Sequence, residues 1–75
     1  MNIFLSKKVM DFLTSKTQSE IATLIGVTQG AIHSYITRSY LPGAINSFLI
    51  MKAMNESKMF KTKITLNDMF DVKNK

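Results

Sequence analysis

The chain has 75 residues, enough for one domain, and its 10 Lys plus Arg against 5 Asp plus Glu give a formal net charge of +5. This balance favours polyanionic partners such as nucleic acid, although many small domains are mildly basic without binding one. The lack of cysteine excludes disulfides and thiolate zinc sites, and no apolar run approaches the roughly 20 residues of a membrane span, so we expect a soluble cytoplasmic protein.

The first part of the chain predicts two short helices with defined starts. Ser6 is a typical N-cap, and the apolar spacing after it predicts a helix over Lys7–Thr14. Thr17 is followed three residues later by Glu20, which is the capping-box pattern in which each side chain satisfies the other residue's backbone amide. A second helix is therefore expected over Gln18–Ile25.

The middle of the chain predicts two further helices. Gly26 follows the last apolar position of the second helix, where a left-handed residue can end it, and Thr28 can cap a third helix over Gln29–Thr37. Pro42 is well suited to the first turn of a fourth helix, because its missing amide proton is not needed there. We expect this helix over Ala44–Asn55.

The last part of the chain has two interpretations. Lys61–Leu66 alternates polar and apolar residues as an exposed strand does, whereas Thr65–Asp68 is a second capping-box pattern that would open a short helix through Phe70. In the first case Asn2–Leu5 would pair with Lys63–Leu66 as a β-ribbon beside a helical core. We favour the second, an all-α fold of about five short helices.

The C-terminal half holds more large apolar residues than one helix face can bury. Phe48 and the three residues after it are consecutive and so cover most directions around the helix axis. We therefore expect one domain over residues 1–70 whose C-terminal part forms a homodimer, followed by a flexible tail over residues 71–75. The predicted interface consists of Phe48, Ile50, Met51, Met54, Met59, Phe60 and Ile64.

The break between the second and third helices has the composition of a known motif. A small residue at Ala22 allows two helices to cross steeply, and Gly26 allows the sharp turn between them. Together with Thr17-Gln18, Glu20, Val27-Thr28-Gln29 and Ala31-Ile32, these residues resemble the helix-turn-helix of lambdoid phage Cro proteins and repressors. Leu41-Pro42 before an amphipathic helix is similar to the same stretch in the all-helical Cro proteins.

The resemblance implies a λ-repressor-like domain that places its third helix in the DNA major groove. It implies that Gln29 is the leading base reader, since a glutamine amide can pair with both adenine N6 and N7, and that Gly30 leaves one usual side-chain contact absent. The implied base contacts are Gln29, Gly30, His33, Ser34 and Thr37. The implied phosphate contacts are Lys16, Thr17, Gln18, Thr28, Arg38 and Tyr40.

The resemblance further implies a Cro-like transcriptional repressor of a bacteriophage, acting at the nucleoid of the bacterial host as a dimer on a palindromic operator. The residues themselves leave open a repressor, an activator or an antitoxin-type regulator. The alternative from another class is a protein-interaction module that uses the Met- and Phe-rich C-terminal surface. We expect no enzyme, cofactor, metal or small-molecule ligand, because no triad, P-loop or metal-ligand spacing is present.

Overall fold

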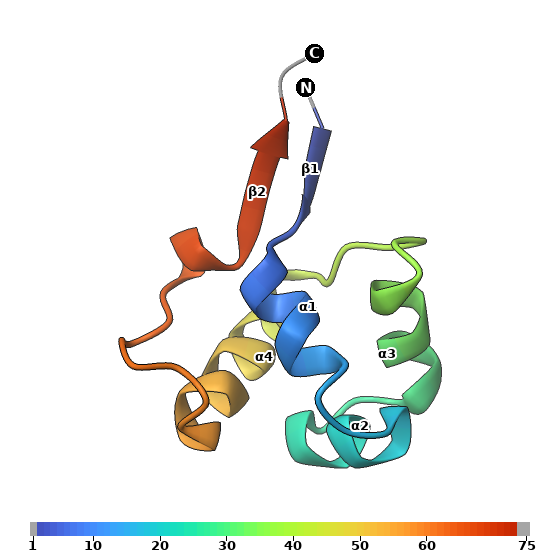
Figure 1. Cartoon of the computed structure of the whole chain (residues 1–75). Helices are drawn as coiled ribbons and strands as arrows, with labels where there is room; N and C mark the ends of the chain where they lie inside the picture. Colours follow the sequence, from blue (N-terminus) through green and yellow to red (C-terminus); the bar gives the residue numbers. More distant parts are fainter. Residues whose placement is uncertain (1, 74–75) are drawn as a thin grey trace.

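The computed structural model describes residues 2–73 as a body of four helices from which two paired strands extend (Figure 1). The two strands lie at the beginning and the end of the described segment, so the ribbon joins its two ends. In chain order the elements are β1 (Asn2–Leu5), α1 (Lys7–Leu13), α2 (Gln18–Ile25), α3 (Gln29–Ile36), α4 (Ala44–Ser57), the 3-10 turn η1 (Leu66–Asp68) and β2 (Phe70–Lys73).

The starts of the first three helices are those predicted from the caps. The hydroxyls of Ser6, Thr17 and Thr28 each accept a hydrogen bond from the backbone amide three residues later. Gly26 ends α2 with a φ of +91°, in the left-handed region where glycine carries no Cβ penalty. Helix α1 and helix α3 each end one residue before the predicted position.

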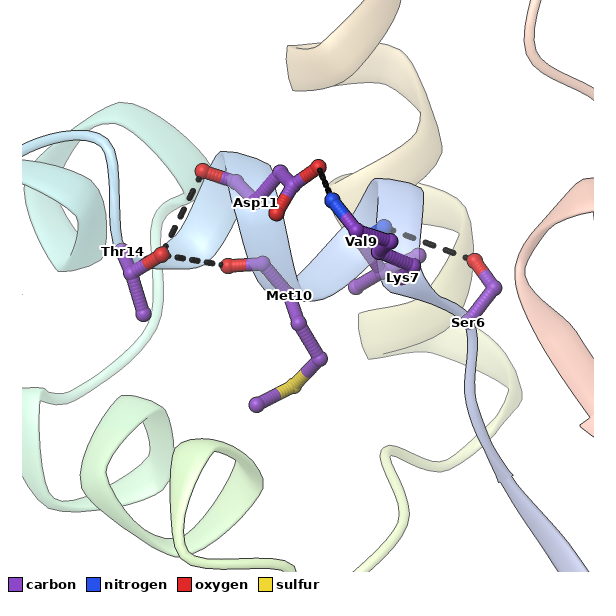
Figure 2. A network of polar contacts seen from close by, with 6 residues as sticks. All are labelled: Ser6, Lys7, Val9, Met10, Asp11 and Thr14. Carbon is purple, nitrogen blue, oxygen red and sulfur yellow. Dashed lines mark hydrogen bonds and ion pairs between the residues drawn. The ribbon is translucent and has the colours of Figure 1, made fainter.

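Helix α1 is also stabilised along its exposed side (Figure 2). The Lys7 ammonium donates to the Asp11 carboxylate at 2.9 Å, four residues on, and the Thr14 hydroxyl donates to the Met10 carbonyl at 2.8 Å. These contacts contribute a few tenths of a kcal/mol each at most, because exposed i,i+4 ion pairs are worth about 0.3–0.5 kcal/mol. The buried apolar face of α1 therefore holds it in place.

Helix α4 differs from the prediction at both ends. Its N-cap is Gly43, so Pro42 lies one residue before the cap rather than in the first turn. The Pro42 carbonyl instead accepts a hydrogen bond from the buried Ser47 hydroxyl at 3.3 Å. The helix continues to Ser57, beyond the predicted end at Asn55.

The fold is mostly helical, as predicted, but it has four helices and a two-stranded antiparallel sheet. It is therefore not strictly all-α and is compatible with the alternative of a helical core with a short β-ribbon. In the sheet, Asn2 pairs with Lys73 and Leu5 pairs with Phe70. The predicted strand partner, Lys63–Leu66, was wrong. Residues 71–73, predicted to lie in a flexible tail, belong to β2, and residues 74 and 75 lie outside the described residues.

The contacts of Ile64 explain why the run around it does not form the strand. The Asn55 side-chain amide donates to the Ile64 carbonyl at 3.1 Å, and its oxygen accepts from the Ile64 amide at 2.7 Å. Both backbone groups of Ile64 are thereby used, and its side chain is fully buried. The capping box at Thr65 is confirmed, but it opens η1 and not a longer helix.

One core joins all four helices, the base of the ribbon, and Ile64 and Met69 on the two sides of η1. Its buried members include Ile50, Met54 and Ile64, each with no exposed surface, so these three residues are wrongly placed in the predicted dimer interface. Ile50 and Met54 are four positions apart, so they lie on the same face of α4, the face that packs against α1 and α2. Met51 and Phe60 are half-buried, whereas Phe48 and Met59 are exposed.

Across residues 2–73, every helix falls short of the length and apolar character that a membrane crossing requires.

Candidate nucleic-acid interface

Helices α2 and α3 form a fixed unit around a tight turn. Ala22 is buried, and its carbonyl accepts hydrogen bonds from the amides of Gly26 at 2.8 Å and Val27 at 3.1 Å. Ile32 is fully buried on the inner side of α3, and Val27 packs against the same core. The small residue and the glycine turn thus occupy the positions that the sequence predicted for them, and Val27 and Ile32 form an apolar wedge beside them.

The outer side of α3 is polar and open. Gln29, Gly30, His33 and Thr37 are exposed, and Ser34 is half-buried at the edge of this face. A Cβ built on Gly30 meets no atom within 4 Å, so the surface there is flat backbone with free space above it. The five predicted base-contact residues therefore share one face or border it.

Gln18 at the start of α2 reaches the same face. Its side-chain nitrogen lies 3.5 Å from Nδ1 of His33, which is a long contact between the first turn of α2 and the middle of α3. An amide nitrogen donates, so Nδ1 is the acceptor when this contact is a hydrogen bond. The contact leaves Nε2 of the exposed His33 ring for a group outside the chain.

The two threonine caps differ in what their hydroxyls can still do. The Thr17 hydroxyl accepts from the Glu20 amide at 3.2 Å and donates to the Glu20 carboxylate at 3.0 Å, so its proton is used within the capping box. The Thr28 hydroxyl accepts from the Ala31 amide at 3.1 Å and keeps its proton for an external acceptor. Of the two, Thr28 is the better phosphate donor.

A carboxylate lies at the N-terminus of α2. Hydrogen bonds from the Thr17 backbone amide and then from the Thr17 hydroxyl lower the pKa of Glu20, so this side chain is ionised at neutral pH. It neutralises part of the positive end of the helix dipole. Lys16, the exposed residue before the cap, is the nearest basic group in the sequence.

Arg38 follows α3 and is turned toward the first strand. It adopts a left-handed backbone conformation with φ of 63°, and its guanidinium carbon lies 5.4 Å from the centre of the Phe4 ring. A guanidinium nitrogen also lies 3.5 Å from the Leu5 carbonyl. These residues border a small pocket of about 130 Å³, and Tyr40, another predicted phosphate contact, is 69% exposed beside it.

One contact that holds α3 was missed in the sequence. The Asn46 side-chain amide of α4 donates to the Tyr35 hydroxyl at 2.9 Å, which satisfies the polar end of a ring that is otherwise buried. The only local signal is that a tyrosine in an apolar helix face needs a polar partner for its hydroxyl. The sequence does not indicate which residue supplies it.

The described residues contain no group of three or more His, Cys, Asp or Glu side chains that could hold a metal ion. Comparison of the chain with protein-family models, with curated proteins and with solved structures gives no match. A function is therefore inferred from the geometry of α2 and α3 and from the sequence resemblance.

Proposed function

We propose that this chain is a sequence-specific DNA-binding transcriptional regulator that inserts α3 into the major groove. The observation that supports this most directly is the open polar face of α3, held rigidly by the buried wedge beneath it. This polar face also lies beside the capped N-terminus of α2. A helix that only supported the fold would not need an open polar face in that position. The resemblance to Cro proteins and repressors supports the role of a repressor.

Base reading is assigned to the outer face of α3. Gln29 lies in the first turn, where the resemblance implies the leading base contact, and its amide can pair with adenine. Gly30 lets the backbone approach the groove closely, because nothing occupies the space above it. His33 is the second reader, with Gln18 orienting its ring, and Ser34 and Thr37 make shorter contacts at the end of the face.

Phosphate contacts are assigned to Lys16, Gln18 and Thr28. The Thr28 hydroxyl keeps a proton to donate, whereas the Thr17 hydroxyl uses its own on Glu20. Arg38 is a weaker candidate, because it would have to leave the Phe4 ring to reach a phosphate.

We propose that the chain acts as a homodimer through the start of α4. Ile45 is 77% exposed and Phe48 is 56% exposed, and the two residues are three positions apart on the same outward side of the helix. Leu41, exposed just before the helix, extends this surface. A second copy that covers the three side chains would pair two recognition helices for a palindromic operator.

The decisive experiment is selection of the purified protein on a randomised duplex pool at about 150 mM salt, followed by sequencing of the retained DNA. We expect an inverted repeat with half-site centres about 34 Å apart, the spacing of one helical turn. Retention without a shared sequence, lost as salt rises, would contradict the proposal and favour a protein-interaction module.

Two substitutions then separate base reading from phosphate contact. Gln29→Ala should lower affinity for the selected operator by about 1–3 kcal/mol while affecting other sequences little. Lys16→Ala is the control, because losing a phosphate contact should weaken binding to all sequences alike. Equal operator affinity of the Gln29→Ala protein and the wild type would remove Gln29 from the reading face.

A further inference from the structure

The segment between α4 and η1 carries a concentration of positive charge away from α3. Lys58, Lys61 and Lys63 lie within six residues, and residues 57–64 contain no acidic residue. Figure 1 shows this segment on the side of the helical body opposite α3. The helix-turn-helix, residues 16–38, carries only two basic residues, against one glutamate. Much of the positive charge therefore lies where α3 cannot use it.

The basic loop, defined here as residues 58–63, is held in one shape by its ends. At its start, the Ser57 hydroxyl donates to the Met54 carbonyl at 2.7 Å and accepts from the Met59 amide at 3.3 Å. At its end, the two hydrogen bonds from Asn55 fix the backbone of Ile64. The lysines thus project from an anchored loop.

The three lysines line one concave surface. Lys58, Lys61 and Lys63 border a pocket of about 350 Å³, with Phe60 and Asn55 also in its wall. All three lysines are exposed, and none forms an ion pair within the part of the chain described here. Their charges are available to an external anion.

The nearest carboxylate in the sequence does not neutralise this surface. Glu56 borders a different pocket, which it shares with Lys16 and Leu24 from the α2 side of the molecule. Asp68, the next acidic residue along the chain, accepts hydrogen bonds from the backbone amide and hydroxyl of Thr65 in the capping box. The basic loop therefore keeps its full positive charge.

We propose that the basic loop binds the phosphate backbone of a second DNA segment, while α3 faces the first. Lysine ammonium groups are mobile point charges, which suits contact with successive phosphates without a fixed geometry. An acidic protein partner would be expected to bury an apolar anchor of the loop. Phe60 is already half-buried against the core, which leaves Met59, 48% exposed, as the anchor on this loop. The inference goes beyond the proposed function, because it needs no contact from α3.

The test compares two triple variants with equal charge loss. The first is Lys58→Gln, Lys61→Gln and Lys63→Gln in the basic loop, and the control is Lys7→Gln, Lys8→Gln and Lys73→Gln elsewhere on the surface. Affinity for a non-specific duplex is measured by fluorescence anisotropy from about 50 to 300 mM salt. Log K falls as log salt rises, and each lost phosphate contact makes this slope shallower by about 0.9. We therefore expect the slope of the loop variant to be shallower than that of the wild type by about 2–3.

A capture experiment then asks whether two DNA segments are held together. Operator duplex on beads is loaded with protein, and a second, labelled duplex is added. The wild type and the control variant should capture the second duplex, while the loop variant should remain on the operator and capture at least tenfold less.

Equal slopes in the two triple variants would overturn the inference and assign the loop to an acidic protein or to solvent. If the loop variant has a shallower salt slope but still captures the second duplex, the loop contacts DNA without holding a second segment, and the proposal is overturned. Failure of the proposed function would give a different result. The selection would then yield no inverted repeat, but the slope of log K against log salt would still depend on the three loop lysines.

Discussion

The guanidinium of Arg38 lies over the aromatic ring of Phe4, 5.4 Å from its centre, and so connects the end of α3 to the first strand. The two residues are 34 positions apart in the sequence, and their contact forms one wall of the small pocket beside the ribbon. The orientation of the candidate recognition helix is thereby coupled to the ribbon that closes the chain.

A double-mutant cycle on this pair measures the coupling. Phe4→Leu, Arg38→Gln and the double variant are compared with the wild type by urea denaturation. We expect a coupling free energy of about 0.5–1 kcal/mol, the usual range for an exposed cation–π contact. Strictly additive losses would show that the two side chains stabilise the fold independently.

Substitution by alanine should have opposite effects on the stability of the fold at Gly26 and at Gly30. Gly26→Ala should destabilise the fold by about 1–2 kcal/mol, because its φ of +91° places an alanine in the left-handed region. Gly30→Ala should instead stabilise it by about 0.5–1 kcal/mol, since Gly30 is within α3 and the new Cβ meets no atom within 4 Å. Urea midpoints of both variants provide the measurement, and a stabilised Gly26→Ala protein would contradict the turn geometry.

At Lys58 the opposite substitution, to glycine, should be stabilising, because this residue has a side chain but a left-handed backbone conformation. Its φ is 60°, so Lys58→Gly should raise the free energy of unfolding by about 0.5–1 kcal/mol. Lys63→Gly is the matched control in the same loop, where φ is not positive and glycine should destabilise by a similar amount. If both variants lose stability equally, the left-handed conformation at Lys58 carries no cost.

The two capping boxes predict how stability depends on pH. Hydrogen bonds from the Thr17 backbone amide and hydroxyl lower the pKa of Glu20, and those from Thr65 lower the pKa of Asp68. A carboxylate whose pKa is lower in the folded state adds stability above its unfolded pKa and loses it as the pH falls through the folded value. Stability should therefore decline below about pH 4.

The Glu20→Gln, Asp68→Asn protein tests this assignment. Its urea midpoint should depend less on pH between about 2 and 5 than that of the wild type, and the two midpoints should converge at the acid end of this range. Parallel curves for the two proteins would place the acid sensitivity at other groups.

Two isoleucines of α4 separate the core from the proposed dimer surface. Ile50→Ala should cost about 2–5 kcal/mol, because Ile50 has no exposed surface, whereas Ile45→Ala should leave monomer stability within about 0.5 kcal/mol of wild type. Analytical ultracentrifugation should show that Ile45→Ala and Phe48→Lys weaken self-association. A concentration-independent monomer mass for the wild type, with and without operator, would contradict the dimer.

The helical part of the fold was predictable because its signals are local. Thr17 with Glu20 marks the start of a helix within four residues, and Gly26 marks its end at the next available position. The apolar spacing at Val9, Phe12 and Leu13 likewise falls on one face of α1, and all three are buried. The residues of the open face of α3 were instead implied by the resemblance to Cro proteins and repressors, and they lie on or beside one side of the helix.

The ribbon and the core face of α4 were not predictable by such signals. β2 has only four residues, and its partner lies at the other end of the chain, so no short-range pattern identifies the pairing. In α4, a run of consecutive apolar residues does not tell which direction meets the core, and Ile50 was assigned to the surface as a result. The position of Arg38 depends on β1 and could not be seen from the helix-turn-helix alone.

The pairing of Asn2 with Lys73 has a consequence for the order in which the molecule assembles. This pairing closes a loop of nearly the entire chain, so its entropy cost is met only after the helices have brought the two strands together. A short linker between the two ends, with new termini opened within residues 58–63, would turn the pairing into a hairpin contact. Because contacts between residues close in sequence form sooner, the circularly permuted chain should fold faster than the original one.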